Sequence, residues 1–386
     1  MIYLDNAATS WPKPDCVLDA LTRYLRDGGA SPGRSGHRLA QAAERLRLDA
    51  REALAELLGV RDPLRIVFTL NATMALNVAL HGLLKRGAHV VTTGMEHNAV
   101  MRPLRALEER GVTISAAACG ADGTLAVETV RSLVRPETRL IVAVHASNVC
   151  GTVLPIREIG AIAREHGVPF LVDAAQTVGV WPIDLRADHI DLLAFTGHKA
   201  LLGPSGTGGL AISDDFDVRH LPPLVHGGTG SRSEHTVQPD FLPDKYEAGT
   251  PNTMGLAGLA ASARYVLERG VERIRAHERQ LAQRVIDGLR TITGVRVLGT
   301  HDAYRQTAAV SFTLDGRSAS DVAEALDEQY GILCRPGLHC APVAHRTLGT
   351  LPHGTVRFAP GLFTTAGEID QALAAVARLA GDAAHG

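Results

Sequence analysis

The stretch Asp191–Leu210, DLLAFTGHKALLGPSGTGGL, places a lysine shortly after what reads as a buried strand. Lysine is scarce in this chain, which holds only Lys13, Lys85, Lys199 and Lys245, while arginine carries nearly all of the positive charge. An amine buried at the end of a strand is costly unless it is neutral or used chemically. A lysine nitrogen, unlike that of arginine, can lose a proton and attack a carbonyl carbon. Lys199 is therefore the first candidate for a catalytic group.

The composition is that of a soluble globular protein of 386 residues, with 45% hydrophobic and 21% charged residues. The formal net charge of −2 gives no reason to expect nucleic acid or an anionic membrane as partner. No apolar run is long enough to span a bilayer, and MIYLDNAATSWPKP lacks the features of a signal peptide. Five cysteines without metal-ligand spacing indicate reduced thiols and no metal site. We expect a cytoplasmic protein.

Between Arg65 and Ser213, short apolar runs alternate with stretches of helical period, which is typical of a mostly parallel sheet with helices on both faces. The expected strands are RIVFT, HVVTT, VTISAAA, RLIVAVHA, PFLVDAA and DLLAFT, and the expected helices include Met74–Leu84, Ala99–Arg110 and Ile156–His166. In α/β sheets of this kind, ligands bind where strands end and loops begin. We expect the functional residues at those ends.

The chain after residue 255 predicts a smaller α+β domain. Its expected elements are helices over Leu256–Arg269, Val271–Arg290, Ser318–Gln329 and Ala366–Leu379, and the strands TAAVSFTL, GILCR and TVRFA. We assign residues 14–255 to a large domain, and residues 1–13 together with 256–386 to the small one. The polar connection over 227–246 is too long for an ordinary loop, so it is either disordered or functional.

A lysine that condenses with a carbonyl suggests pyridoxal 5′-phosphate, which makes three demands on a protein. Its phosphate needs backbone N–H groups at a helix start, preferably with hydroxyl groups. Its pyridine nitrogen needs a carboxylate, and its ring needs a flat partner. Four segments at expected strand ends supply these groups: Ala72 and Thr73 for the phosphate, His97 for the ring, Asp173 and Gln176 for the nitrogen side, and Thr196 and His198 beside Lys199.

Each of these features also has an ordinary structural interpretation. A polar pair at a helix start is usually only a cap. A single aspartate after an apolar strand is more often a turn or cap residue, and a single histidine after such a strand usually lies on the surface. The order along the chain, with phosphate helix, ring histidine, aspartate and lysine in succession, favours the cofactor site.

The same segments resemble the class V aminotransferase-like pyridoxal phosphate enzymes, and within them the cysteine desulfurases and selenocysteine lyases. YLDNAATS, EHNAV, SNVCGTV, VDAAQTVG, TGHKALLGPSGTG, YEAGTPN and VRFAPGLFTT are similar to motifs of that family and occur in its order. The resemblance runs nearly from end to end. It implies an α/β protein of the pyridoxal phosphate-dependent transferase fold type I, with a large domain and a smaller α+β domain.

The resemblance implies a role for each matching residue. Lys199 carries the cofactor as an aldimine, and His97 stacks on its ring and serves as an acid or base. Asp173 holds the pyridine nitrogen and Gln176 contacts the phenolic oxygen, while the phosphate is held by Ala72, Thr73, Thr196 and His198. Asn148 lies near cofactor and substrate, and Arg357 clamps the substrate carboxylate. The family is dimeric with shared active sites, and Thr250 matches a threonine that reaches the phosphate of the neighbouring subunit.

The segment Arg335–His345, RPGLHCAPVAH, distinguishes among the reactions of this fold. Cys340 resembles the nucleophilic cysteine of the desulfurases, and R-x-G-x-H-C is closest to their second group, which has a short ordered loop. We expect Cys340 to attack the substrate sulfur, with His339 or Arg335 favouring its thiolate. The alternatives are a buried structural thiol and a zinc site of His339, Cys340 and His345, which lacks a clear fourth ligand.

The sequence thus predicts a cysteine desulfurase that converts L-cysteine to L-alanine and leaves a persulfide on Cys340. A sulfur-acceptor protein would then serve iron–sulfur cluster assembly, thiocofactor or natural-product synthesis. A selenocysteine lyase acting on L-selenocysteine, and an aminotransferase or epimerase with an incidental cysteine, are the enzymatic alternatives. A non-enzymatic scaffold is disfavoured because every cofactor-contact position is filled. The 227–246 insert and SPGRSGHRLA depart from the usual housekeeping desulfurases and indicate a side branch.

Overall fold

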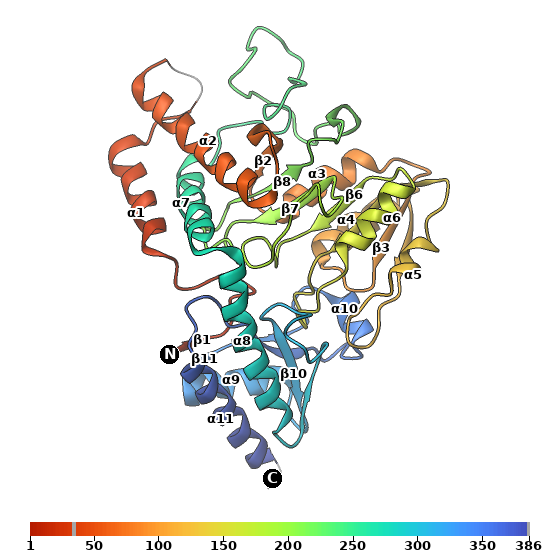
Figure 1. The fold of residues 1–386 in the computed structure, drawn as a ribbon, viewed down its shortest axis with the longest axis vertical. Coiled ribbons are helices and arrows are strands. Elements are labelled where there is room, and N and C mark those ends of the chain that lie inside the picture. Colours follow the sequence, from red (N-terminus) through yellow and green to blue (C-terminus); the bar gives the residue numbers. More distant parts are fainter. Residues whose placement is uncertain (33–35, 384–386) are drawn as a thin grey trace.

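The computed structural model describes residues 1–32 and 36–383 (Figure 1); residues 33–35, within the SPGRSGHRLA segment, lie outside the described part. A seven-stranded sheet runs in the order β2-β8-β7-β6-β5-β3-β4. Its strands are β2 (Ile66–Thr69), β3 (His89–Thr93), β4 (Thr113–Ala117), β5 (Thr138–Val144), β6 (Phe170–Asp173), β7 (Leu192–Thr196) and β8 (Gly208–Ile212). All are parallel except β8, which is antiparallel to both β2 and β7. The expected mostly parallel α/β sheet is confirmed.

The strand β8 is absent from the sequence-based expectation because its sequence begins with two glycines, which weaken a strand in isolation. In the fold these glycines allow close packing. A Cβ atom on Gly208 would lie 2.7 Å from the Cα of Asn71, and one on Gly209 would lie 2.4 Å from the carbonyl oxygen of Val67. The strand therefore fits between β2 and β7 only because it carries no side chains at these positions.

Different helices cover the two faces of the sheet. On one face, α3 (Ala72–Leu83) and α4 (Asn98–Glu108) pack with sheet residues such as Val90 and Leu192. On the other face, α2 (Arg38–Leu58), α6 (Ile156–Glu165) and α7 (Thr253–Arg269) share a core with Val91 and Leu193. Adjacent strand residues point to opposite faces, and because both faces are covered the strands are apolar throughout. The remaining helices of this half are α1 (Asp15–Arg23), which packs on α7, and α5 (Val127–Arg131).

A second sheet lies below the first in Figure 1, in the order β12-β13-β10-β9. It consists of β9 (Val295–Val297), β10 (Val310–Leu314), β12 (Arg335–Gly337) and β13 (Thr355–Phe358), and it shares a core with α8 (Val271–Arg290), α9 (Ala319–Tyr330) and α11 (Ala366–Ala383). The short helix α10 (Pro342–Thr347) precedes β13. The N-terminal strand β1 (Ile2–Tyr3) pairs in parallel with β11 (Ile332–Leu333), so the chain start belongs to this half.

We propose the division into residues 14–255 and residues 1–13 with 256–386 as the domain organisation. Helix α8 runs from the upper half of Figure 1 into the lower one and packs on α11, while α7 packs on α2. Residues 227–246 contain neither helix nor strand, and a loop of this segment projects at the top of the molecule in Figure 1, whereas Lys245 and Tyr246 at its end are buried. Among the described helices, none has the length and apolar character needed to cross a membrane.

Candidate active site

Four of the predicted site residues lie at or just beyond the carboxyl ends of the central strands. Asp173 is the last residue of β6 and Thr196 the last of β7, while Lys199 follows β7 and His97 follows β3 within a few residues. The carboxyl ends of parallel strands lie at one edge of the sheet, so these side chains converge although they are distant in sequence.

A pocket at this edge collects nine of the ten residues that the sequence analysis assigns to the cofactor. The space between its lining atoms, open solvent included, is about 480 Å³. The nine are Ala72, Thr73, His97, Asn148, Asp173, Gln176, Thr196, His198 and Lys199. The tenth, Thr250, lines a separate pocket, open to solvent, together with Met74 and Gly206.

The amine of Lys199 lies among several charged groups. The pKa of this amine is lowered to about 8, chiefly by burial. The guanidinium groups of Arg357 and Arg335 contribute to this lowering, and the carboxylate of Asp173 opposes it. A negative charge on Cys340 also raises this pKa, as the smallest of these effects. A lysine with a pKa near 8 carries an appreciable fraction of free amine at neutral pH, as attack on a carbonyl requires.

We expect the rate at which the apo-protein captures pyridoxal 5′-phosphate to rise with pH and to level off above about pH 8. The pKa of Lys199 is lowered to about 8, so its unprotonated, nucleophilic form becomes dominant above that pH. Stopped-flow absorbance of cofactor capture between pH 6 and pH 11 measures this midpoint. A midpoint near the ordinary lysine pKa of about 10.4 would show that the amine is not desolvated as described.

Asp173 and His97 both line this pocket, and burial shifts their pKa values in opposite directions. Burial raises the pKa of Asp173, whose Oδ1 accepts a hydrogen bond of 3.1 Å from the N–H of Ala175. Burial, followed by the charge of Lys199, lowers the pKa of His97 to about 4, so its ring is neutral at neutral pH. Nδ1 of His97 accepts the N–H of Ala99 at 3.0 Å as the cap of α4, which leaves the ring proton on Nε2.

The start of α3 and the loop around His198 suit an anion. Asn71 caps α3 by accepting the N–H of Met74 at 2.9 Å, and the exposed Thr73 lies in the first turn, where free N–H groups favour negative charge. Burial lowers the pKa of His198 to about 4, and its Nδ1 is buried with no hydrogen-bond partner in the described structure. An unpartnered ring nitrogen, in the pocket that the start of α3 also lines, fits the phosphate of the cofactor when that nitrogen carries the ring proton.

Arg357, on β13, is 1% exposed and lies between two acceptors. Its Nη1 donates to the carbonyl oxygen of Asn148 at 2.8 Å, and its Nη2 donates to Oδ1 of Asp5 at 2.6 Å. Nε of Arg357 and Oδ1 of Asn148 are buried without partners among the described atoms. The unused donor of Arg357 fits the predicted carboxylate site, whereas Oδ1 of Asn148 is an acceptor and fits a donor group of the substrate or cofactor.

Cys340 is an exposed free thiol on a strained turn. Both His339 and Cys340 have positive φ angles, of 48° and 58°, which side-chain-bearing residues seldom adopt. The turn is fixed because the N–H of Asn98 donates to the carbonyl oxygen of Cys340 at 2.9 Å. Nη2 of Arg335 lies 3.9 Å from Sγ of Cys340 and supplies a positive charge beside the sulfur.

His339 does not provide that charge. Burial, followed by the charge of Arg357, lowers the pKa of His339 well below its usual value, so the ring is neutral, and its Nε2 contacts Oγ1 of Thr355 at 3.0 Å. Of the two neighbours predicted to favour the thiolate, Arg335 is therefore the one that carries charge. Among the described residues, no group of three or more His, Cys, Asp or Glu side chains is arranged to hold a metal.

The N-terminal segment supplies contacts that the sequence analysis does not assign. The residue directly before Lys199 is His198. Its carbonyl oxygen accepts hydrogen bonds from the hydroxyl group of Ser10 at 3.1 Å and from the amine of Lys13 at 2.9 Å. Gln176 donates to the carbonyl oxygen of Ala7 at 3.1 Å. These contacts join positions more than 150 residues apart, and no local pattern marks them.

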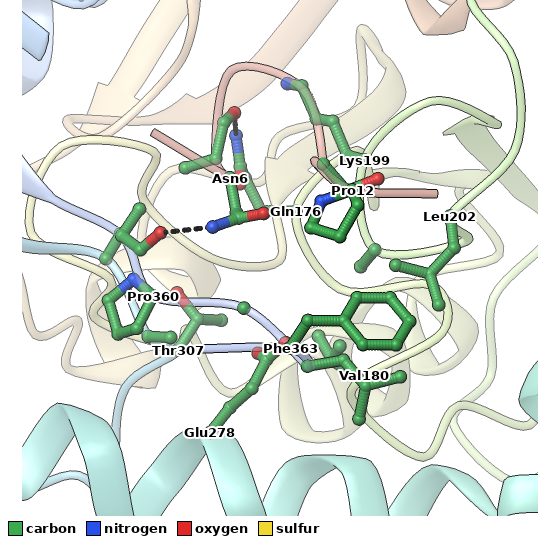
Figure 2. A pocket seen from close by; sticks show the side chains of 18 residues that line it. Asn6, Pro12, Gln176, Val180, Lys199, Leu202, Glu278, Thr307, Pro360 and Phe363 are labelled. Carbon is green, nitrogen blue, oxygen red and sulfur yellow. Dashed lines mark hydrogen bonds between the residues drawn. The ribbon is translucent and has the colours of Figure 1, made fainter. Parts of the chain in front are cut away.

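Figure 2 shows a cavity that adjoins the cofactor pocket and shares Gln176 and Lys199 with it. Glu278 rises from α8 on one side, and Lys199 lies on the opposite side in this view. Burial raises the pKa of Glu278 to about 8. Asn6, from the N-terminal segment, therefore lines this cavity together with Lys199 and Glu278.

Comparison with known proteins agrees with this geometry. Residues 2–372 match the family Aminotransferase class-V. A probable cysteine desulfurase of Methanothermobacter thermautotrophicus is 36% identical, with 95% of this chain and 92% of that protein aligned. A probable cysteine desulfurase of Streptomyces coelicolor is 35% identical over 96% of this chain and 90% of its own length.

Two solved structures share the fold. The apo cysteine desulfurase of Thermococcus onnurineus NA1 superposes with a TM-score of 0.92 at 33% identity, covering 99% of this chain and 95% of its own. The cysteine desulfurase CsdA of Escherichia coli, in its S-sulfonic acid form, gives 0.86 at 28% identity, covering 97% and 94%. The fold type I architecture is therefore confirmed, and the chain belongs to the class V aminotransferase family.

Proposed function

We propose that the protein is a pyridoxal phosphate-dependent cysteine desulfurase, which converts L-cysteine to L-alanine and holds the sulfur as a persulfide on Cys340. One observation carries this proposal: an exposed thiol on a strained turn lies beside Arg335, and that turn is joined to the pocket because Nδ2 of Asn148 donates to the carbonyl oxygen of His339 at 2.6 Å. Relatives that align along nearly the whole chain bear the name cysteine desulfurase, which supports the same activity.

The donors and acceptors of the pocket suit pyridoxal 5′-phosphate. Thr73 and His198 would hold the phosphate, Asp173 the pyridine nitrogen, His97 the ring face, and Lys199 the aldehyde carbon; Ala72, Thr196, Gln176 and Asn148 complete the lining. When bound, the cofactor would supply an electron sink that weakens bonds at the α and β carbons of an amino acid. Because Nδ1 of His97 already accepts a hydrogen bond, only its Nε2–H can face the substrate as a donor.

The side chains of the protein then divide the remaining work. Arg357 would hold the substrate carboxylate, and Asn148, whose free Oδ1 is an acceptor, would face a donor group of the substrate or cofactor. The free amine of Lys199 would move a proton at the α carbon. The thiolate of Cys340 would attack the substrate sulfur, forming the S–S bond as the Cβ–S bond breaks, with the electron pair of that bond left on carbon. The β carbon then takes up a proton, so that alanine and a persulfide are the products.

The experiment that tests this proposal is incubation of the holoenzyme with L-cysteine and a reductant, with alanine and sulfide measured together. Equal amounts of both products support desulfuration. Alanine from L-selenocysteine but not from L-cysteine would make the protein a selenocysteine lyase instead. Transfer of the amino group to an oxo acid, without sulfide, would indicate an aminotransferase and would leave Cys340 without its proposed role.

We propose a homodimer in which Thr250 of each subunit reaches the cofactor phosphate of the other. Apolar side chains that line the pocket of Thr250 are exposed: Leu70 is 64% exposed, Leu224 40% and Val225 42%. A partner subunit would cover such a surface.

This arrangement predicts a sedimentation mass of twice the chain mass, and a Thr250→Val variant that binds the cofactor about ten-fold more weakly because a hydrogen bond to a charged group is lost. Equilibrium dialysis measures the affinity. Thr236→Val, an exposed threonine of the 227–246 connection, is the control and should leave it unchanged. A monomer that binds the cofactor normally would contradict the shared site.

The cellular setting is also a proposal. All five cysteines are free thiols, consistent with a reducing, cytoplasmic location. The persulfide on Cys340 would be passed to an acceptor protein, in iron–sulfur cluster assembly or a related sulfur-using synthesis. Because the thiol is exposed, an acceptor nucleophile can approach it without unfolding of the turn.

A further inference from the structure

The N-terminal segment positions a carboxylate on the arginine that is proposed to clamp the substrate. Asp5 forms a parallel bridge with Ala359, two residues after Arg357. The N–H of Ala359 donates to the carbonyl oxygen of Leu4 at 2.7 Å, and the N–H of Asn6 donates to that of Ala359 at 3.1 Å. Backbone hydrogen bonds on both sides of Asp5 thus fix where its side chain meets the guanidinium.

The contact leaves the guanidinium little freedom. A planar group held at Nη1 by Asn148 and at Nη2 by Asp5 cannot rotate without breaking one of two hydrogen bonds, of 2.8 Å and 2.6 Å. The buried Nε of Arg357 has no acceptor among the described residues, so part of the donor fork remains for a ligand. Holding such a fork in advance lowers the entropy lost when a carboxylate binds.

Asp5 also balances an otherwise unfavourable charge. Arg335 and Arg357 are direct cross-strand partners in β12 and β13, so two guanidinium groups leave the same face of the sheet. Burial lowers the pKa of Arg357 and Arg335 adds to that shift, whereas Asp5 opposes both. Among the described residues, Arg335 has no carboxylate within ion-pair distance, so Asp5 is the carboxylate that compensates this pair.

We propose that Asp5 is a positioning residue of the substrate-carboxylate clamp, which holds the guanidinium of Arg357 in the orientation that binds the carboxylate of the amino-acid substrate. This inference rests on the proposed function, because it assigns Arg357 to that carboxylate. Asp5 itself need not touch the substrate. If the ion pair only stabilised the fold, its loss would weaken all ligands of the pocket equally. If Asp5 positions Arg357, its loss should weaken ligands with a carboxylate more than ligands without one.

The test compares two ligands that differ only in the carboxylate. L-Alanine and L-alaninamide are titrated into the holoenzyme, and the visible absorption of the bound cofactor reports their dissociation constants. In Asp5→Asn, which keeps the shape and loses the charge, we expect L-alanine to bind about ten-fold more weakly, as for a weakened hydrogen bond to a charged group. L-Alaninamide binding and cofactor affinity by dialysis should change little, while the melting temperature should fall because Arg335 and Arg357 lose their compensating carboxylate.

Three further variants make the result interpretable. Arg357→Ala should lose the preference for L-alanine at least as strongly. Asp188→Asn is the matched control, since the buried Asp188 pairs with Arg157 at 2.8 Å and precedes β7, at the opposite edge of the sheet. Asp5→Glu keeps the charge, so it should retain part of the preference even if Asp5→Asn folds poorly.

Two outcomes would overturn the proposal. If Asp5→Asn weakens both ligands equally, or lowers cofactor affinity and melting temperature without changing the preference, Asp5 is a structural residue. If Arg357→Ala loses the preference and Asp5→Asn keeps it, the clamp exists but does not depend on Asp5. A preference that survives Arg357→Ala would instead refute the clamp, and with it the proposed substrate site, whatever Asp5 does.

Discussion

Replacing Lys199 by alanine is expected to abolish covalent attachment of the cofactor and to lower turnover of L-cysteine by about 10³-fold or more, because both the carbonyl-attacking amine and the α-carbon proton carrier are lost. After borohydride reduction, mass spectrometry of the wild type should find the cofactor mass on the peptide that contains Lys199. The variant should bind the cofactor only reversibly, through the other residues of the pocket.

Lys85→Ala is the control for this prediction. Lys85 lies beyond α3, and among the described residues its amine hydrogen-bonds only to the carbonyl oxygen of His81, at 3.4 Å, so its removal should change neither attachment nor turnover. If Lys199→Ala still carried the cofactor covalently, another amine would be the attachment point. The lowered pKa of Lys199 would then reflect burial alone.

Replacing Cys340 by serine should lower alanine formation from L-cysteine by about 10³-fold or more, since a hydroxyl replaces the thiolate nucleophile. Cofactor binding should be unchanged, because Cys340 is not among the residues that line the cofactor pocket. The measurement is the initial rate of alanine release, together with the visible absorption of the bound cofactor.

Cys119→Ser is the matched control, because this partly buried thiol has a pKa raised by burial to about 11 and is not expected to react. A Cys340→Ser variant that still released alanine from L-cysteine would mean that the thiol is not the sulfur acceptor. If that variant lost activity with L-cysteine and kept it with L-selenocysteine, the thiol would be needed to remove sulfur, the poorer leaving group, and would not be needed to remove selenium.

The central sheet was predictable because its strands are buried on both faces and read as uninterrupted apolar runs, with helical periods between them. RIVFT and DLLAFT correspond to β2 and β7 with one residue of difference at the start. β8 was not predictable in the same way. Its glycines resemble a loop, and their function is visible only where the backbones of Asn71 and Val67 approach.

Site residues such as Asp173 and Lys199 were predictable because a polar or reactive side chain closely follows an apolar strand in the sequence. Contacts that depend on topology were not. Asp5 meets Arg357 across 352 positions, and only the pairing of the N-terminal segment with the end of β13 brings them together. The proposed role of Thr250 requires a second subunit, so the fold of one chain cannot reveal it.

The most direct test of the account is mass spectrometry of the holoenzyme after a brief reaction with L-cysteine, without reductant. We predict that the peptide containing Cys340 gains the mass of one sulfur atom, in step with the alanine released. Alkylation of Cys340 before the reaction should prevent both. Alanine formed without added sulfur on Cys340, or sulfur found on Cys119 or Cys150 instead, would contradict the assignment of Cys340 as the persulfide carrier.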